Sequence, residues 1–196
     1  MSEPASGPIP TQPLPAWRVQ STQTVLDSPW LKVRADRCIT EEGYEVAPYY
    51  VLQYPDWALV VAIDTEGELI LVQQYRHAAA VTSTELPCGG VDKSDADAVA
   101  AAQRELLEET GYSEGQWTYI ERLAANPATQ TNYCHIVLAI DVRKTAEPIE
   151  DAAEKIRVVR TPVGDAINLA LEGGVIQAMH VAALALALSR IGQWGR

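Results

Sequence analysis

Cysteines are scarce in this sequence, and their positions exclude a structural metal site built from thiolates. The three that it has, Cys38, Cys88 and Cys134, are odd in number and far apart, whereas zinc sites use cysteines or histidines only a few residues apart. We therefore expect reduced thiols and a cytoplasmic protein.

Long apolar runs are also lacking. No stretch has the length and apolar character of a membrane-spanning helix. Residues 1–15 are rich in proline and polar residues, which predicts a disordered tail rather than a signal peptide.

Basic residues are few compared with acidic ones. The chain has 15 Lys and Arg against 26 Asp and Glu, a formal net charge of −11. Nucleic acids and anionic membranes are bound largely through Lys and Arg, so we expect neither as a partner. An anionic small substrate would require metal ions and locally placed arginines.

The remaining composition indicates one folded core with a small addition. The chain has 196 residues, of which 47% are hydrophobic. Short β-type runs at residues 30–34 and 49–52 flank a turn signal at residues 41–43. We therefore predict an antiparallel β segment over residues 16–55 and a main domain over residues 56–196.

Strands and helices are mixed in the predicted main domain. Apolar periodicity predicts strands at residues 57–63, 69–74, 117–124, 135–142 and 156–159, and helices at residues 96–110, 163–171 and 175–188. The last helix is rich in Ala and Leu, which is typical of a helix buried in a core or an interface. This order of elements indicates an α/β/α sandwich.

Three carboxylates cluster near the end of the first predicted helix. Residues 104–111 read Arg-Glu-Leu-Leu-Glu-Glu-Thr-Gly, and helical geometry places Glu105, Glu108 and Glu109 on one face. Like charges at this spacing repel one another, but a hard divalent cation such as Mg²⁺ would bind them. An ordinary solvated helix is the alternative that the spacing alone leaves open.

The wider pattern resembles the Nudix box. Residues 85–92 read Glu-Leu-Pro-Cys-Gly-Gly-Val-Asp, and an Ala-rich run leads from there into Arg104. In Nudix hydrolases a glycine is followed by five residues, a Glu, seven residues and then Arg-Glu, an aliphatic residue, any residue, Glu-Glu, any residue and Gly. The resemblance implies a Nudix α/β/α sandwich with a mixed sheet, and hydrolysis that depends on Mg²⁺ or Mn²⁺.

The match has two possible registers. Counting back from Arg104 places Gly90 at the opening glycine and Ala96 at the first glutamate. Counting forward instead places Gly89 and Asp95 at these positions, with one extra residue before Arg104. In the family an aliphatic residue follows the last glycine of the box, and Tyr112 replaces it here, as a variation in packing.

The resemblance implies which residues form the catalytic centre. Phosphoanhydride hydrolysis requires neutralisation of charge on phosphate oxygens and a positioned water. The resemblance implies these roles: metal ligands Glu105, Glu108, Glu109 and the backbone carbonyl of Gly89 or Cys88, and Arg104 as the arginine that holds a box carboxylate. Glu108 and Arg104 are thus expected to belong to the catalytic machinery.

A general base is expected from a later loop. Residues 150–158 resemble the loop and strand that carry a catalytic glutamate in ADP-ribose pyrophosphatases, a Nudix subfamily, and Glu154 matches that glutamate best. Glu150 and Asp151 are the reserves. The alternative is a solvated acidic loop without a catalytic role.

Substrate contacts are also implied by the ADP-ribose pyrophosphatase subfamily. Arg76 is expected to meet phosphate, Glu85 to hold substrate at the edge of the metal site, and Trp30 to stack on the base. Tyr49 or Tyr50 could contact the base from a partner subunit, although a core or interface position is the alternative for each aromatic residue.

Two further features bear on the substrate. Pro127 lies fifteen residues after Tyr112, near the offset typical of Nudix enzymes that act on ADP-ribose. The three histidines, His77, His135 and His180, are scattered singly, so we expect structural roles for them.

We therefore predict a homodimeric Nudix hydrolase, joined through its N-terminal β segment, that cleaves ADP-ribose or a related nucleoside diphosphate sugar. Another nucleotide, such as GDP-mannose or a dinucleotide, is the alternative within enzymes. A Nudix-fold binding or regulatory module is the alternative from another class. Ala96 favours that module, whereas the intact Arg-Glu-x-x-Glu-Glu run argues against it.

Overall fold

The structure is a computed structural model that describes residues 12–149 and 155–194. Most of the predicted disordered tail, residues 1–11, lies outside the described residues. Contacts divide the chain into two compact units, one ending at Gln53 and the other beginning at Tyr54. Each unit is described by itself below.

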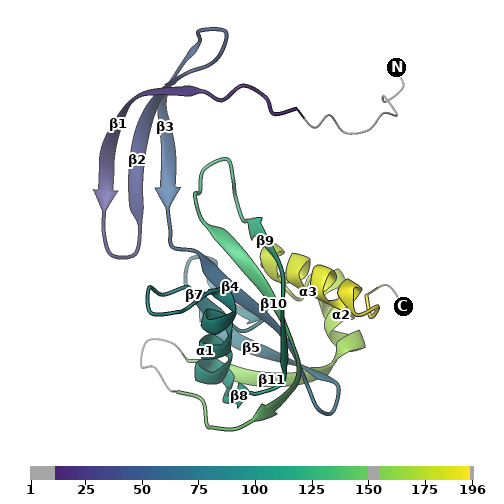
Figure 1. The fold of residues 1–196 in the computed structure, drawn as a ribbon. Coiled ribbons are helices and arrows are strands. Elements are labelled where there is room, and N and C mark those ends of the chain that lie inside the picture. Colours follow the sequence, from purple (N-terminus) through teal and green to yellow (C-terminus); the bar gives the residue numbers. More distant parts are fainter. Residues whose placement is uncertain (1–11, 150–154, 195–196) are drawn as a thin grey trace, which may run out of the picture. The chain divides into compact units, whose positions relative to one another are not determined.

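The first unit contains a three-stranded antiparallel sheet (Figure 1). Its strands are β1 (Arg18–Asp27), β2 (Lys32–Ile39) and β3 (Glu45–Gln53), in that order across the sheet. The predicted turn between β2 and β3 is present, and Gly43 there has a φ of 85°, which favours glycine. All ten residues of β1 are exposed, including Val19, Val25 and Leu26, so this sheet buries little apolar surface within its own unit.

The second unit is built around a mixed sheet of eight strands. They are β4 (Trp57–Asp64), β5 (Glu68–Arg76), β6 (Val81–Glu85), β7 (Cys88–Gly90), β8 (Tyr112–Ser113), β9 (Gln116–Ala124), β10 (Tyr133–Lys144) and β11 (Arg157–Pro162). The main path runs β11-β5-β4-β10-β8, with β6 on β5, β7 on β4 and β9 on β10. Strands β4 and β10 are parallel, and the other pairs are antiparallel.

Helices cover both faces of this sheet (Figure 1). Helix α1 (Ala98–Thr110) packs on one face, and α2 (Val163–Leu171) and α3 (Ala178–Arg190) pack on the other. Alternate residues of β4 enter the two cores, for example Val60 beside α1 and Leu59 beside α3. Burial on both faces explains why β4 is a continuous apolar run. The predicted α/β/α sandwich is confirmed.

Two helices begin later than the sequence predicted, because polar side chains cap them. Asp97 accepts a hydrogen bond from the Ala100 N–H at 2.9 Å and starts α1 two residues after Ala96. Gln177 accepts a hydrogen bond from the Met179 N–H and starts α3. Helix α1 ends as predicted at Gly111, whose φ is 75°.

Neither α1, α2 nor α3 is long and apolar enough to cross a membrane.

Candidate active site

The turn after β6 brings a glycine against the acidic face of α1. Gly89 lies on β7, which pairs with β4, and a Cβ atom added at Gly89 would overlap the Glu105 carboxyl group. A Cβ at Gly90 would have no neighbour within 4 Å. The glycine at position 89 therefore leaves room for the Glu105 carboxylate where it now lies, which fits the register that opens at Gly89.

The three predicted ligand carboxylates differ in their surroundings. Glu109 is buried, and its Oε2 accepts a hydrogen bond from the Cys88 N–H at 3.0 Å. Glu105 lies against Gly89, whereas Glu108 is partly exposed. The carboxylates of Glu105 and Glu109 thus meet the backbone of β7, where the predicted ligand carbonyl lies.

Arg104 donates hydrogen bonds to several of these acidic residues. Its Nη1 donates to Glu105 Oε1 at 2.7 Å and to Glu108 Oε2 at 3.1 Å, and its Nη2 donates to the Gly90 carbonyl at 2.8 Å. Its Nε and Nη2 also donate to the two Asp95 oxygens, at 3.2 and 3.0 Å. This bidentate pair is the strong form of an Arg–carboxylate contact.

Asp95 is the strongest partner of Arg104. The hydrogen bonds to Asp95 are the largest cause that raises the pKa of Arg104, and those from Arg104 are the largest that lower the pKa of Asp95. Asp95 therefore contacts Arg104 and occupies the first acidic position of the box in the register that opens at Gly89. The methyl group of Ala96 could not make this contact.

Asp95→Asn is expected to lower kcat for phosphoanhydride hydrolysis about tenfold, because residues that orient metal ligands typically contribute 10- to 100-fold. Steady-state kinetics with saturating Mg²⁺ would measure this loss. Asp92→Asn is the matched control, since its carboxylate is 69% exposed and lies 3.8 Å from Arg104. Equal activity in both variants would show that Asp95 does not position the ligands.

The donor set suits a hard divalent cation. Asp95, Glu105 and Glu108 surround a single guanidinium, so negative charge is in excess, and Glu109 adds to it. Oxygen ligands of this kind are those that Mg²⁺ and Mn²⁺ prefer. The residues therefore fit the predicted ligand set of Glu105, Glu108, Glu109 and a carbonyl at Gly89 or Cys88.

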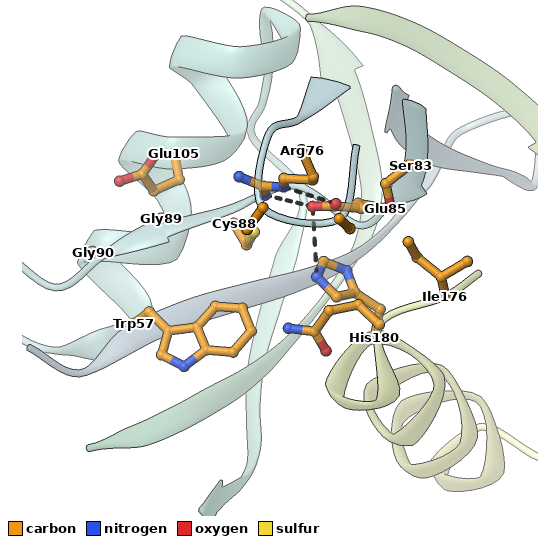
Figure 2. Close-up of a pocket in the computed structure, with 13 residues that line it drawn as sticks. Trp57, Arg76, Ser83, Glu85, Cys88, Gly89, Gly90, Glu105, Ile176 and His180 are labelled. Atoms are coloured by element: carbon orange, nitrogen blue, oxygen red, sulfur yellow. Dashed lines mark hydrogen bonds and ion pairs between the residues drawn. The ribbon is translucent and has the colours of Figure 1, made fainter. Parts of the chain in front are cut away.

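A pocket of about 660 Å³ opens beside these residues. Gly89 and Glu105 line it on the acidic side, and Trp57 and His180 line it elsewhere (Figure 2). The pocket is also lined by Ile176 and Gln177, which lie just before α3. The pocket has the size of a site for a small-molecule ligand.

Arg76 and Glu85, both predicted substrate contacts, form an ion pair in this pocket (Figure 2). Arg76 Nε donates to Glu85 Oε1 at 2.9 Å and Nη2 donates to Oε2 at 2.5 Å. Burial alone would raise the pKa of Glu85, but the hydrogen bonds and charge of Arg76 outweigh it and hold that pKa below its ordinary value. Glu85 is thus kept anionic, while the side chain of Arg76 remains 42% exposed.

His180 is a pocket residue that the sequence did not single out as functional. It is buried on α3 and lies beside Glu85, and burial lowers its pKa to about 4. One signal could have indicated it, because His180 shares the buried face of an Ala/Leu-rich helix with Leu184 and Leu188. A polar side chain on such a face requires a partner.

The remaining predicted residues lie either in the first unit or outside the described residues. Trp30 is 85% exposed between β1 and β2, and the Tyr49 ring packs edge-on against Trp17 at 5.7 Å. Both lie in the first unit, so their contact with substrate stays a prediction. Glu154, Glu150 and Asp151 lie outside the described residues.

Two known protein families match this chain. A family model for the NUDIX domain matches residues 54–178. The chain belongs to the Nudix family. A second family model, the nucleoside diphosphate sugar hydrolase N-terminal domain, matches residues 17–52. The two matches cover the acidic site and the three-stranded sheet respectively.

Individual relatives of this Nudix protein include two ADP-ribose pyrophosphatases. The one from Bacillus subtilis (strain 168) is 31% identical over 120 residues, which cover 61% of this chain and 64% of that protein. The match thus spans a little under two thirds of the relative's length. The one from Mycobacterium tuberculosis (strain ATCC 25618 / H37Rv) is 24% identical over 163 residues, which cover 83% of this chain and 78% of that protein.

A solved structure supports the fold. The crystal structure of an ADP compounds hydrolase superposes with a TM-score of 0.81 and 23% sequence identity, covering 93% of this chain and 100% of the other. This similarity independently shows the Nudix α/β/α fold.

Proposed function

We propose that this Nudix protein hydrolyses the diphosphate linkage of ADP-ribose or a related nucleoside diphosphate sugar, with Mg²⁺ or Mn²⁺ as cofactor. The products are a nucleoside monophosphate and a sugar phosphate. The observation that carries the proposal is a single pocket that is lined by Glu105 and by the Arg76–Glu85 ion pair. The Glu105 carboxyl group lies against Gly89 there. The names of the two bacterial relatives support the choice of ADP-ribose.

Each side chain contributes a defined part of the chemistry. A bound divalent ion would neutralise charge that develops on the phosphate oxygens and help to activate water. Arg104 holds Glu105 and Glu108 as ligands for it. The exposed guanidinium of Arg76 is placed to bind a phosphate group, and Glu85 orients that guanidinium.

The enzyme is favoured over a binding or regulatory module because of the Asp95–Arg104 contact. Ala96 was the feature that supported the module, since it left the first acidic position of the box empty. Asp95 supplies a carboxylate to Arg104 in its place, and Glu105, Glu108 and Glu109 are all present.

A panel of substrates tests the proposal. ADP-ribose, GDP-mannose and a dinucleotide would each be incubated with the protein and Mg²⁺ or Mn²⁺, and the products separated by chromatography. We expect ADP-ribose to give AMP and ribose phosphate with the highest kcat/KM. Preference for GDP-mannose or the dinucleotide would support the alternative enzymes, and binding without turnover would support the regulatory module.

Glu154 is proposed as the general base. Glu154→Gln is expected to lower kcat about 10²-fold and to change KM little, because a base acts in the transition state. Steady-state kinetics of Glu150→Gln and Asp151→Asn provide matched controls from the same segment of the chain, and both should be milder. Loss of kcat in one of these controls, with Glu154→Gln unaffected, would show that the base is misassigned.

The N-terminal unit is proposed to form a homodimer and to supply Trp30 and Tyr49 to the substrate. Its support is the apolar surface that the unit leaves exposed, including Trp17, Val25 and Leu26. Sedimentation of the full-length chain should give a dimer at micromolar concentration, and a clean monomer would contradict this.

A cytoplasmic location is proposed because the three cysteines are all free and buried, as expected of thiols in a reducing compartment.

A further inference from the structure

His180 approaches Glu85 with a fixed orientation. The His180 Nδ1 accepts a hydrogen bond from the Leu86 N–H at 2.9 Å, and the Nε2 lies 3.8 Å from Glu85 Oε2. A ring nitrogen that accepts a hydrogen bond carries no proton, so in the neutral imidazole the proton lies on Nε2. His180 therefore points an N–H donor at the carboxylate that Arg76 already holds (Figure 2).

A metal site is the other use for these side chains. Glu85, Cys88 and His180 each place a ligand atom within 4.8 Å of the others. However, a neutral histidine that binds metal through Nε2 carries its proton on Nδ1, where the Leu86 N–H already donates. Arg76 also occupies both oxygens of Glu85. The hydrogen bonds thus favour a His180–Glu85 pair over a metal ion.

The buried position of Glu85 favours donors besides Arg76, and the Ser83 hydroxyl is one that also lowers the pKa of Glu85. Glu85 is 2% exposed, and a buried carboxylate without partners is strongly destabilised. Its main partner, Arg76, is partly exposed in the pocket, where a phosphate group of the substrate would compete for its N–H donors. Arg76 gives two of its five N–H donors to Glu85; a phosphate group that draws the guanidinium toward itself lengthens these two hydrogen bonds.

We propose that His180 is a positioning residue, which holds Glu85 through its Nε2–H when Arg76 engages a phosphate group of the substrate. This inference rests on the proposed function of the pocket. A small rotation of Glu85 would shorten the 3.8 Å separation to a hydrogen bond. Burial lowers the pKa of His180 to about 4, which keeps the ring neutral and its tautomer defined near pH 7.

Two substitutions separate the two nitrogen atoms. In His180→Asn, the amide oxygen can still accept the Leu86 N–H, but the donor toward Glu85 is lost. In His180→Gln, the longer amide can place an N–H near Glu85, but the acceptor for Leu86 is lost. His180→Asn therefore removes only the donor toward Glu85, and His180→Gln removes only the acceptor for the Leu86 N–H.

We expect the two variants to have opposite effects on KM and Tm. With ADP-ribose and Mg²⁺, His180→Asn should raise KM about tenfold, the scale of a lost hydrogen bond to a charged group, with kcat little changed. His180→Gln should keep KM within about threefold of the wild type but lower Tm more than His180→Asn does, because a buried N–H is left without an acceptor. A merely structural role would instead make KM follow Tm.

A second measurement does not depend on activity. Nitrogen NMR of the imidazoles should show the Nε2–H tautomer for His180 near pH 7, with the resonance assigned by its loss in His180→Gln. An Nδ1–H tautomer, or equal KM values in the two variants, would overturn the role of His180. Failure of the wild type to hydrolyse any nucleoside diphosphate sugar would instead overturn the proposed function, and this role with it.

Discussion

Glu109→Gln is expected to lower kcat for ADP-ribose by about 10²-fold or more, the scale of removing a key stabiliser of transition-state charge. The substitution removes a charge from the predicted ligand set. It also keeps an oxygen that can accept the Cys88 N–H, which Glu109 accepts at 3.0 Å. Activity should therefore fall while the fold is retained, as measured by kinetics and circular dichroism.

Glu172→Gln is a suitable control, because Glu172 is an exposed residue that caps the end of α2. It should leave kcat and the Mg²⁺ dependence unchanged. Full activity of Glu109→Gln, with a native circular dichroism spectrum, would exclude Glu109 as a ligand.

Gly89→Ala is the second substitution with a large expected effect. The added methyl group would overlap the Glu105 carboxyl group. Because that carboxyl group ends a flexible side chain, it can move aside while the backbone stays folded. A displacement of about 1 Å in a catalytic site can cost about 10²-fold in rate, so we expect a loss of that size in kcat and weaker Mg²⁺ dependence of the rate.

Gly90→Ala provides the matched comparison at the neighbouring position. A methyl group at Gly90 has open space around it, and the carbonyl that Arg104 contacts is part of the backbone. We expect Gly90→Ala to retain most of the activity. If Gly90→Ala were the damaging variant and Gly89→Ala were active, the box would open at Gly90 instead.

Much of the fold follows from local patterns in the sequence. Helix α2 begins and ends where the apolar periodicity predicted, whereas β4 extends the predicted apolar run by one residue and β5 by three. Strands β7 and β8 contain three and two residues, which is too short for periodicity to detect. Such strands depend on pairing with partners that are distant in the sequence.

The helix starts show a different limit. The acidic cluster and Gly111 defined the end of α1, but an Ala-rich approach does not reveal its first residue. The side chain of Asp97 determines that start by accepting a hydrogen bond from the Ala100 N–H, although two other aspartates, Asp92 and Asp95, lie just before it in the sequence. Capping is thus a choice among neighbouring polar residues, which geometry rather than periodicity resolves.

The site was predictable where its residues are close in sequence. The carboxylates of α1 were predicted from their spacing and their resemblance to the Nudix box. The pairing of Asp95 with Arg104 could not be decided by counting, because the loop before α1 tolerates an extra residue. His180 stands singly in the sequence, which indicates a structural role, and its partner Leu86 lies 94 residues away, beyond the reach of any local pattern.

Hydrolysis of ADP-ribose by the purified full-length protein, with Mg²⁺ and then with excess chelator, tests the central claim most directly. We predict equal amounts of AMP and ribose phosphate in the presence of Mg²⁺, no product with chelator, and recovery when Mg²⁺ is added back. Product formation that is unaffected by chelator would contradict the metal-dependent mechanism. No product from ADP-ribose or from any other nucleoside diphosphate sugar, under any of these conditions, would contradict the proposed function.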